Sequence, residues 1–234
     1  MKDAAAIQHE YYKATAARYD RMHGGDDHEH GFALALMVSM IDFLGVNSVL
    51  DVGAGTGHMV LHLKRTRPHL RVMGIEPSPD LREQGYRKGL TSEELTDGDA
   101  RDLKLRDGEF DLVCEFGVLH HVCDPHRVVE EMLRVAARAI FVSDSNNFGQ
   151  GSLLARMIKQ TLNALHLWPL ANFVKTHGKG YSLTAGDGLS YSYSVFNDYA
   201  KIKEKCLAVH VLNTGGDGRN SYRSASHVAL IGVK

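Results

Sequence analysis

Residues 49–58, Val-Leu-Asp-Val-Gly-Ala-Gly-Thr-Gly-His, constrain the fold more than any other part of the chain. Apolar residues lead into Asp51, glycines alternate at positions 53, 55 and 57, and an apolar segment with helical character follows at 59–63. This order is typical of a buried strand, a tight glycine turn and a helix start. Such a junction directs backbone N–H groups and a positive helix end at one spot, and glycine lets a ligand approach the backbone closely. The stretch therefore predicts a nucleotide-type cofactor site.

Strand and helix patterns alternate along the rest of the chain, which predicts an α/β fold with a doubly wound, mostly parallel sheet. Strands are expected at 48–52, 71–75, 92–97, 110–115, 138–143, 206–212 and 225–233. Helices are expected at 3–22, 32–44, from the glycine turn to about 66, from Pro79 with Ser78 as its N-cap, from Pro125 to about 137 with Asp124 as its cap, and at about 150–166. The polar turn at 215–218 predicts that the last two strands form an antiparallel pair.

The 234 residues suffice for one α/β domain with a full core. We expect a single domain that consists of an N-terminal helical cap (1–44), a cofactor-binding core (48–143), a lid or acceptor-binding insertion (144–200) and a C-terminal strand pair (205–234). The segment 175–194 is rich in glycine, serine and tyrosine, and a structureless loop of this length is usually a functional lid.

The composition argues against several classes of partner. With 27 Lys and Arg residues against 28 Asp and Glu residues, the net charge of −1 disfavours nucleic acid or an anionic membrane as the main partner, although it allows a local basic patch. Cys114, Cys123 and Cys206 lack metal-type spacing and are expected to be unpaired thiols in a reducing compartment. The first residues lack the apolar core of a signal peptide, and no stretch approaches the length of a membrane span. We therefore expect a cytoplasmic monomer or homodimer with no nucleic-acid or membrane partner.

The spacing of the glycines distinguishes between two classes of cofactor. A dinucleotide site requires Gly-x-Gly-x-x-Gly, and His58 stands where its third glycine belongs. The pattern from Asp51 to Gly57, Asp-x-Gly-x-Gly-x-Gly, instead resembles motif I of the class I S-adenosylmethionine-dependent methyltransferases. Further similarities lie in Glu76, in Gly98-Asp99-Ala100, in 110–113 with 119–125, and in Tyr11-Tyr12 with Arg18-Tyr19-Asp20. The resemblance covers nearly the whole chain, more loosely over 145–200, and favours the small-molecule type of this family.

This resemblance implies a Rossmann-like, seven-stranded sheet with an antiparallel last strand, and S-adenosylmethionine as the cofactor. It implies that Glu76 binds the ribose hydroxyls, that Asp99 holds the adenine amino group and that Asp51 lies near the methionine end. The cofactor-binding residues that it implies are Asp51, Gly53, Ala54, Gly55, Gly57, Glu76, Pro77, Asp99, Ala100, Glu115, Phe116 and Tyr19.

His120 and His121 are the candidate catalytic residues, because histidine is the usual general base near neutral pH and the pair follows the fourth strand. Adjacent side chains cannot both face the same point, and only the family pattern favours His121. Residues expected to contact the acceptor are Tyr12, His23, Asn146, His177, Tyr181 and Tyr191. The histidines and carboxylates of the 23–30 loop could ligate a metal, but such clusters are more often solvated, so no metal is predicted.

The predicted activity is methyl transfer from S-adenosylmethionine to an oxygen or nitrogen atom of a small-molecule acceptor. One alternative is an NAD(P)-dependent oxidoreductase, which His58 and the lack of a Tyr-x-x-x-Lys pair after the fourth strand disfavour. Another is a non-catalytic cofactor-binding protein that acts through a partner. An acceptor-sized cavity would favour the enzyme, whereas a site filled by residues 145–200 would favour the binding protein.

Overall fold

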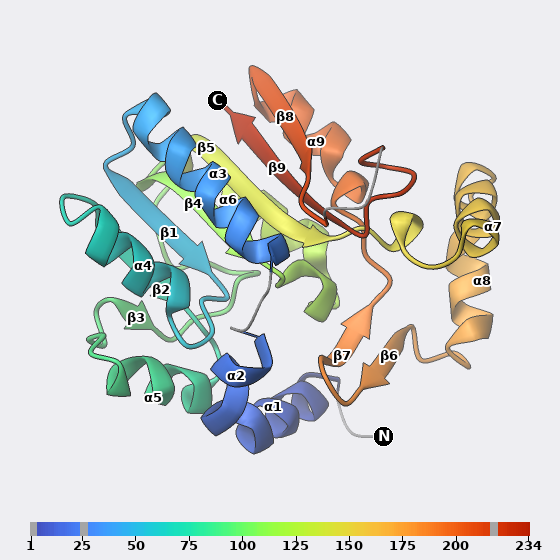
Figure 1. The fold of residues 1–234 in the computed structure, drawn as a ribbon, viewed down its shortest axis with the longest axis horizontal. Coiled ribbons are helices and arrows are strands. Elements are labelled where there is room, and N and C mark those ends of the chain that lie inside the picture. The colour runs from blue at the N-terminus through green and yellow to red at the C-terminus, as the bar shows by residue number, and fades with distance from the viewer. Residues whose placement is uncertain (1–3, 24–27, 216–219) are drawn as a thin grey trace.

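A seven-stranded sheet in the order β3-β2-β1-β4-β5-β9-β8 forms the centre of the computed structural model, which describes residues 4–23, 28–215 and 220–234 (Figure 1). The strands are β1 (Ser48–Val52), β2 (Arg71–Ile75), β3 (Leu95–Thr96), β4 (Phe110–Phe116), β5 (Ala136–Ser145), β8 (Ala208–Asn213) and β9 (His227–Val233). Strands β1 to β5 are parallel, and β9 runs antiparallel to both β5 and β8. The predicted doubly wound sheet, with its antiparallel last strand, is confirmed.

Helices cover both faces of this sheet and form two separate cores (Figure 1). They are α1 (Ala4–Thr15), α2 (Tyr19–His23), α3 (His28–Leu44), α4 (His58–Thr66), α5 (Pro79–Arg87), α6 (Pro125–Val135), α7 (Leu153–Ala164), α8 (Trp168–Lys175) and α9 (Tyr199–Lys205). Helices α3 and α4 pack on one face through Met37, Ile41 and Leu63, while α6 and α9 pack on the other through Met132 and Ile202. No helix among the described residues combines the length and the apolarity needed to cross a bilayer.

The predictions that rest on local signals agree closely with the structure. Strands β1 and β2 have the predicted bounds, because buried parallel strands appear in sequence as short, continuous apolar runs. The Ser78 side chain accepts a hydrogen bond from the Leu81 N–H at the start of α5, and Asp124 accepts one from the Arg127 N–H at the start of α6. Both predicted helix caps are therefore confirmed.

The structure departs from the predictions in the first 30 residues and between β5 and β8. Helix α3 begins at His28 rather than at 32, and the predicted helix at 150–166 is followed by α8, which starts at the Trp168-Pro169 pair. The predicted structureless stretch at 175–194 contains a hairpin of β6 (Tyr181–Thr184) and β7 (Gly188–Tyr191). Helix α9 was also not predicted.

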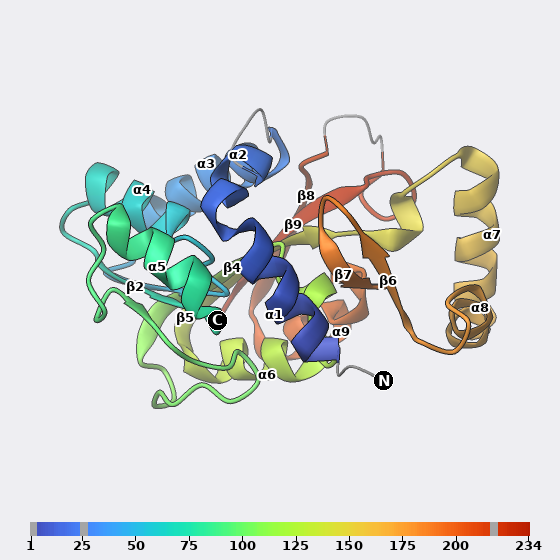
Figure 2. The same cartoon turned by 90° about the horizontal axis from the view of Figure 1, so that it is seen from below.

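The hairpin and the N-terminal cap meet in front of the sheet (Figure 2). The Leu189 N–H of β7 donates to Oε1 of Gln8 in α1 across 2.7 Å, and this bond is buried. Gly188 allows the close approach, because its φ is +71° and a Cβ there would lie 2.8 Å from the Tyr11 ring. Two segments almost at opposite ends of the chain thus form one cover.

The segment after β5 is held against residues 220–225 by backbone and side-chain contacts. The Asn146 side chain, fully buried, donates to the carbonyls of Ser221, Tyr222 and Ala225. Gly149 lies so close to the same loop that a Cβ would come within 1.8 Å of the Ala225 carbonyl oxygen. Because that oxygen belongs to the backbone, no rotamer change could relieve the overlap.

Gly149→Ala should therefore lower the free energy of unfolding by about 3 kcal/mol, since the added methyl group overpacks a fixed backbone. The matched control is Gly186→Ala, where a Cβ meets nothing within 4 Å, and we expect it to change stability by less than about 0.5 kcal/mol. Urea denaturation followed by circular dichroism measures both. Equal losses in the two variants would contradict this account of the contact.

Candidate active site

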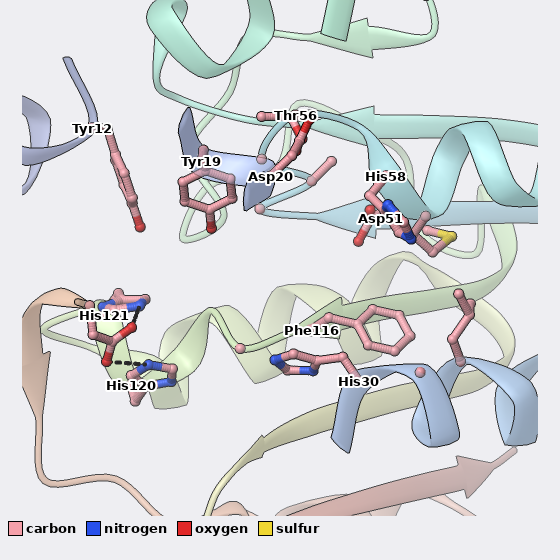
Figure 3. A pocket seen from close by; sticks show the side chains of 18 of the residues that line it. Tyr12, Tyr19, Asp20, His30, Asp51, Thr56, His58, Phe116, His120 and His121 are labelled. Atoms are coloured by element: carbon pink, nitrogen blue, oxygen red, sulfur yellow. Dashed lines mark hydrogen bonds and ion pairs between the residues drawn. The ribbon is translucent and has the colours of Figure 1, made fainter. Parts of the chain in front are cut away.

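A cavity of about 350 Å³ lies beyond the carboxyl ends of β1 and β4 (Figure 3). Its lining residues come from the N-terminal helices, the glycine turn, the end of β4 and the hairpin: Tyr11, Tyr12, Tyr19, Asp20, His30, Gly31, Leu34, Asp51, Gly53, Ala54, Gly55, Thr56, His58, Met59, Phe116, Gly117, His120, His121 and Asp187. This is the edge at which open α/β sheets bind ligands. None of these described lining residues is a lysine or an arginine.

The glycine turn forms one wall of the cavity. Gly53, Gly55 and Gly57 have φ values of +74°, +55° and +75°, which a residue with a Cβ rarely adopts. The N–H groups of Gly53 and Ala54 donate to the Ile75 carbonyl, and that of Gly55 donates to Glu76. The turn's own N–H groups are thus largely used inside the protein. The start of α4, which has no side-chain cap, provides the N–H groups for an anionic ligand group.

Two buried carboxyl groups lie beneath this turn. Burial, together with the nearby Glu76 carboxylate, raises the pKa of Asp51 to about 8. Burial likewise raises the pKa of Glu76 to about 7, although hydrogen bonds from the N–H groups of Ser78 and Gly55 oppose the shift. No cation opposes the shift at Asp51, which is a costly state for a carboxylate, whereas Arg82 lowers the pKa of Glu76.

The N-terminal helices cover the turn through aromatic and polar contacts. The Tyr12 and Tyr19 rings meet edge to face with their centroids 6.0 Å apart, and a Cβ on Gly55 would lie 3.6 Å from the Tyr19 ring. The Thr56 hydroxyl donates to Asp20 of α2 across 2.6 Å. The Lys88 ammonium donates to the Thr56 hydroxyl and forms an ion pair with the Asp20 carboxylate. This polar cluster fastens the helical cap to the glycine turn.

Asp144, at the end of β5, organises the loop that carries the two histidines. Its side chain is fully buried and accepts hydrogen bonds from the N–H groups of Leu119 and His120. It also meets Nδ1 of His120 at 2.7 Å. Burial alone would lower the pKa of His120, but the carboxylates of Asp144 and Asp187 raise it to about 10. His120 is therefore a cation at neutral pH.

His121 has a different environment. Its Nδ1 lies 2.6 Å from the Leu189 carbonyl oxygen in β7. Because a carbonyl only accepts hydrogen bonds, Nδ1 must carry the proton, and neutral His121 has its lone pair on Nε2. That Nε2 faces Asp187 at 3.4 Å, while Nε2 of His120 faces the other Asp187 oxygen at 3.5 Å (Figure 3). The two imidazoles hold the pKa of Asp187 below its usual range, against the effect of burial.

His120, His121 and Asp187 also place one ligand-type atom each within 4.8 Å of one another, so this trio has the geometry to hold a metal ion. Asp187 already forms an ion pair with the charged His120 and lies 3.4 Å from Nε2 of His121. The pair with His120 explains the position of Asp187 without a metal.

A second cavity of about 200 Å³ adjoins the same group from the side of α8 and the hairpin. His120 and Asp187 line both cavities. The second one is polar: its other lining residues are Ser145, Asn147, Gln150, Asn172, Lys175, Thr176, Gly180, Tyr181, Ser182, Ser190, Tyr191, Ser192 and Tyr193.

Comparisons with known proteins agree with this geometry. Residues 50–139 match the family described as "Methyltransferase domain". The chain is 38% identical over 95 residues to ajmaline N-methyltransferase of Rauvolfia serpentina, which covers 38% of this chain and 32% of that protein. It is 33% identical over 102 residues to demethylmenaquinone methyltransferase of Thermotoga maritima, which covers 44% of each chain. The matched stretches thus span less than half of these curated relatives.

The fold comparison extends over the whole chain. Magnesium protoporphyrin IX methyltransferase from Synechocystis, solved with bound SAH, superposes with a TM-score of 0.63 over 99% of this chain and 100% of its own, at 16% identity. This chain therefore has the Rossmann-like methyltransferase fold, and its residues 50–139 match the methyltransferase domain. S-Adenosylmethionine is the cofactor that this domain match and the motifs of the sequence imply.

The first cavity fits S-adenosylmethionine. Glycines keep side chains out of the wall at 53 and 55, and the uncapped start of α4 suits the carboxylate of an amino acid. A sulfonium cation suits a cavity bordered by the rings of Tyr12, Tyr19 and Phe116 and by the Asp51 carboxyl group, with no lysine or arginine among its described lining residues.

Several predicted site residues line a cavity. Among the predicted cofactor residues, Asp51, Gly53, Ala54, Gly55, Phe116 and Tyr19 line the first cavity, together with the predicted catalytic pair His120 and His121 and the predicted acceptor residue Tyr12. Tyr181 and Tyr191 line the second. Their individual roles stay predictions.

Other predicted site residues lie outside the linings of both cavities. Gly57 is the N-cap of α4, and Glu76, Pro77, Asp99, Ala100 and Glu115 line neither cavity. Asp99 forms a bidentate ion pair with the Arg101 guanidinium rather than presenting both oxygens to a ligand. Glu115 is fully buried, where it accepts hydrogen bonds from the N–H groups of Val118 and Ser143.

Among the predicted acceptor residues, Asn146 is a buried structural link and His177 is exposed outside both cavities. The His23 side chain lies outside what the structure describes, as do residues 24–27 of the possible metal-binding loop. Asp144, Asp187 and Lys88 were not predicted as site residues. Asp144 follows an apolar strand and Asp187 sits in a glycine-rich turn, so neither stands out locally.

Asp51→Asn should stabilise the ligand-free protein yet weaken cofactor binding. The raised pKa means that ionising Asp51 costs stability: the penalty is absent below its unfolded pKa and grows as pH rises toward about 8. The advantage of the variant should therefore increase by at least about 1 kcal/mol between about pH 6 and about pH 8, as urea denaturation would show. Calorimetric titration should show an affinity for S-adenosylmethionine about tenfold lower.

The matched control is Asp42→Asn, because Asp42 is an aspartate on α3 that bonds Arg67 far from the cavity. It should leave the cofactor affinity unchanged and should gain no stability as pH rises. A pH-independent stability difference for Asp51→Asn would contradict the burial argument.

The His120 ion pairs predict the opposite dependence on pH. Because the pKa of His120 is raised, its contribution to stability is complete below the unfolded pKa and is lost as pH rises through about 10. The stability difference between wild type and His120→Asn should therefore shrink by at least about 1 kcal/mol from about pH 7 to about pH 10. Urea denaturation at both pH values measures it, and a constant difference would show that the pairs with Asp144 and Asp187 contribute little.

Proposed function

We propose that this protein transfers a methyl group from S-adenosylmethionine to an oxygen or nitrogen atom of a small-molecule acceptor. The observation that carries the proposal is that one cavity has the glycine turn and Asp51 on one wall and the His121–Asp187 pair on another. The cofactor supplies an electrophilic methyl group on a sulfonium and leaves as a neutral thioether, so its departure needs no acid. What this chain must supply is alignment, exclusion of water and a place for the acceptor's proton.

His121 is the residue that takes the proton. Its Nδ1 is held by the Leu189 carbonyl, which leaves the lone pair of Nε2 on the cavity side. Asp187 lies 3.4 Å from that nitrogen and stabilises the imidazolium once it forms. His120 cannot do this work at neutral pH, because the same carboxylate and Asp144 keep it protonated. Its role is to position Asp187.

The cavities favour a small acceptor. The first has a volume of about 350 Å³ and is shared with the cofactor, and the second, of about 200 Å³, is lined mainly by hydroxyl, amide and tyrosine side chains. Both curated relatives described above are named for small-molecule acceptors, one of them an N-methyltransferase. These names support the acceptor class, and only the first of them states the atom that is methylated.

The two competing functions have less support. An oxidoreductase is disfavoured by the family match and by His58 at the position of the third dinucleotide glycine. A non-catalytic binding protein is disfavoured because residues 145–200 do not fill the first cavity. Of that segment only Asp187 borders it.

His121→Asn should lower kcat for a hydroxyl acceptor by about 100-fold to 10,000-fold, the usual contribution of a general base. Its affinity for S-adenosylmethionine should stay within about threefold of wild type, because the cofactor side of the cavity is unchanged. The assay follows radiolabelled methyl transfer from S-adenosylmethionine into a fractionated metabolite extract, and calorimetry gives the affinity.

The matched control is His126→Asn, which removes a half-exposed imidazole that bonds Asp198 outside both cavities and should leave turnover unchanged. Treatment with a chelator should also leave turnover unchanged. Full turnover by His121→Asn would refute the base, and a failure of wild type to bind S-adenosylmethionine would refute the proposed function itself.

A further inference from the structure

Helices α7 and α8, here called the outer hairpin (153–175), lie at the end of the molecule farthest from β3 (Figures 1 and 2). Neither helix contains a single buried residue. A run of large apolar side chains is instead exposed by 45 to 68%: Leu153, Leu154, Met157, Ile158, Leu165, Leu167, Leu170, Phe173 and Val174. Contiguous apolar exposure of this kind marks a surface that binds something.

The polar face of α7 is the one turned toward the body of the protein. Gln160 donates to the carbonyls of Phe148 and Arg223, and Asn163 donates to the Tyr222 hydroxyl. Lys159 bonds the carbonyls of Asn147 and Gln150. Because these polar residues occupy one side of the helix, the apolar stripe at 154, 157 and 158 must lie on the other. Its exposure is therefore built into the fold.

Helix α8 repeats this arrangement. Trp168 donates from its indole nitrogen to the Ser192 hydroxyl across 2.9 Å, and Asn172 and Lys175 line the second cavity. Leu170, Phe173 and Val174 are left on the outside, each more than half exposed. Both helices thus use their polar sides for attachment and leave their apolar sides uncovered.

The charges around the outer hairpin indicate what covers it. Residues 145–186 contain none of the 28 Asp and Glu residues of the chain but four of its Lys and Arg residues: Arg156, Lys159, Lys175 and Lys179. None of these four forms an ion pair with a described residue. The near-neutral net charge is therefore unevenly distributed: residues 145–186 are cationic, and the rest of the chain is acidic.

We propose that the outer hairpin docks in the headgroup region of an anionic lipid bilayer. Lys159 and Lys175 lie on the attached sides of the helices, which leaves Arg156 and Lys179 to meet anionic headgroups. Apolar side chains accompanied by lysine and arginine are the pattern of a helix that lies in the membrane interface, where apolar burial and attraction to anionic lipids add together. A second copy of this chain fits less well, because an isologous dimer through this face would oppose like charges with no acidic residue to pair them. This proposal departs, for this end of the molecule, from the expectation of no membrane partner, which rests on the net charge of the whole chain.

Docking would also place the second cavity beside the lipid surface. Asn172, Lys175 and Thr176, at the carboxyl-terminal end of α8, line that cavity, which leads to His120 and Asp187. An amphiphilic acceptor carried in the membrane would then enter from this side. This last step rests on the proposed function, whereas the docking itself does not.

The test is co-sedimentation of the full chain with vesicles, without any assay of methyl transfer. Binding to vesicles of equimolar phosphatidylcholine and phosphatidylglycerol should exceed binding to pure phosphatidylcholine by at least about tenfold and should weaken with added salt. Met157→Asp and Phe173→Asp should each lower binding to the anionic vesicles by about tenfold or more. Arg156→Glu with Lys179→Glu should remove most of the preference for anionic lipid.

The matched controls are Phe43→Asp and Leu207→Asp, which introduce the same charge at apolar residues that are 81% and 91% exposed outside the outer hairpin. They should bind vesicles like wild type, and circular dichroism checks the fold of every variant. Equal binding to both vesicle types, no binding to either, or equal loss in the controls would overturn the proposal. A dimer that forms without lipid and that Met157→Asp dissociates would overturn it in favour of a second copy.

Discussion

The buried carboxylate of Asp144 is the interaction on which the histidine loop depends. It accepts hydrogen bonds from two successive N–H groups, at 119 and 120, and pairs with the His120 ring. A fully buried carboxylate is tolerated only when such partners compensate its desolvation. Because β5 is held between β4 and β9, the position of Asp144 is set by the centre of the sheet, and through it the sheet sets the position of His120.

His120 in turn positions Asp187, and this links the rigid sheet to the hairpin of β6 and β7. The hairpin is also held by the Leu189 carbonyl on His121 and by the Leu189 N–H on Gln8. One residue of β7 thus contacts both the histidine loop and the N-terminal helix through its two backbone groups. Any movement of the hairpin would therefore disturb the hydrogen bond at Nδ1 of His121 and the cover over the cavity together.

The sequence predicts well what depends on neighbouring residues. The glycine turn, the two capped helices and the first five strands follow from patterns a few residues long, and all of them appear in the structure. Asp187 could not be predicted, because its role depends on a pairing with histidines that lie more than 60 positions away in the chain. Asn146 and Glu115 look like site residues at strand ends, but burial turns them into internal hydrogen-bonding groups. Burial of this kind is decided by tertiary packing, which a local pattern does not record.

The orientation of the outer hairpin is a second feature of the fold that local sequence patterns do not predict. An amphipathic stripe at 153, 154, 157, 158 and 165 predicts a helix, and normally its apolar side would face the core. Here Gln160 and Asn163 bond half-buried polar groups of Phe148 and Tyr222, so attachment through the polar side is the arrangement that leaves those groups paired. The apolar side then has no partner within the chain. The sequence periodicity is the same whether the apolar side of such a helix faces the core or faces outward. Only the hydrogen bonds of the folded protein distinguish a helix that packs on its own core from one whose apolar face is open to another surface.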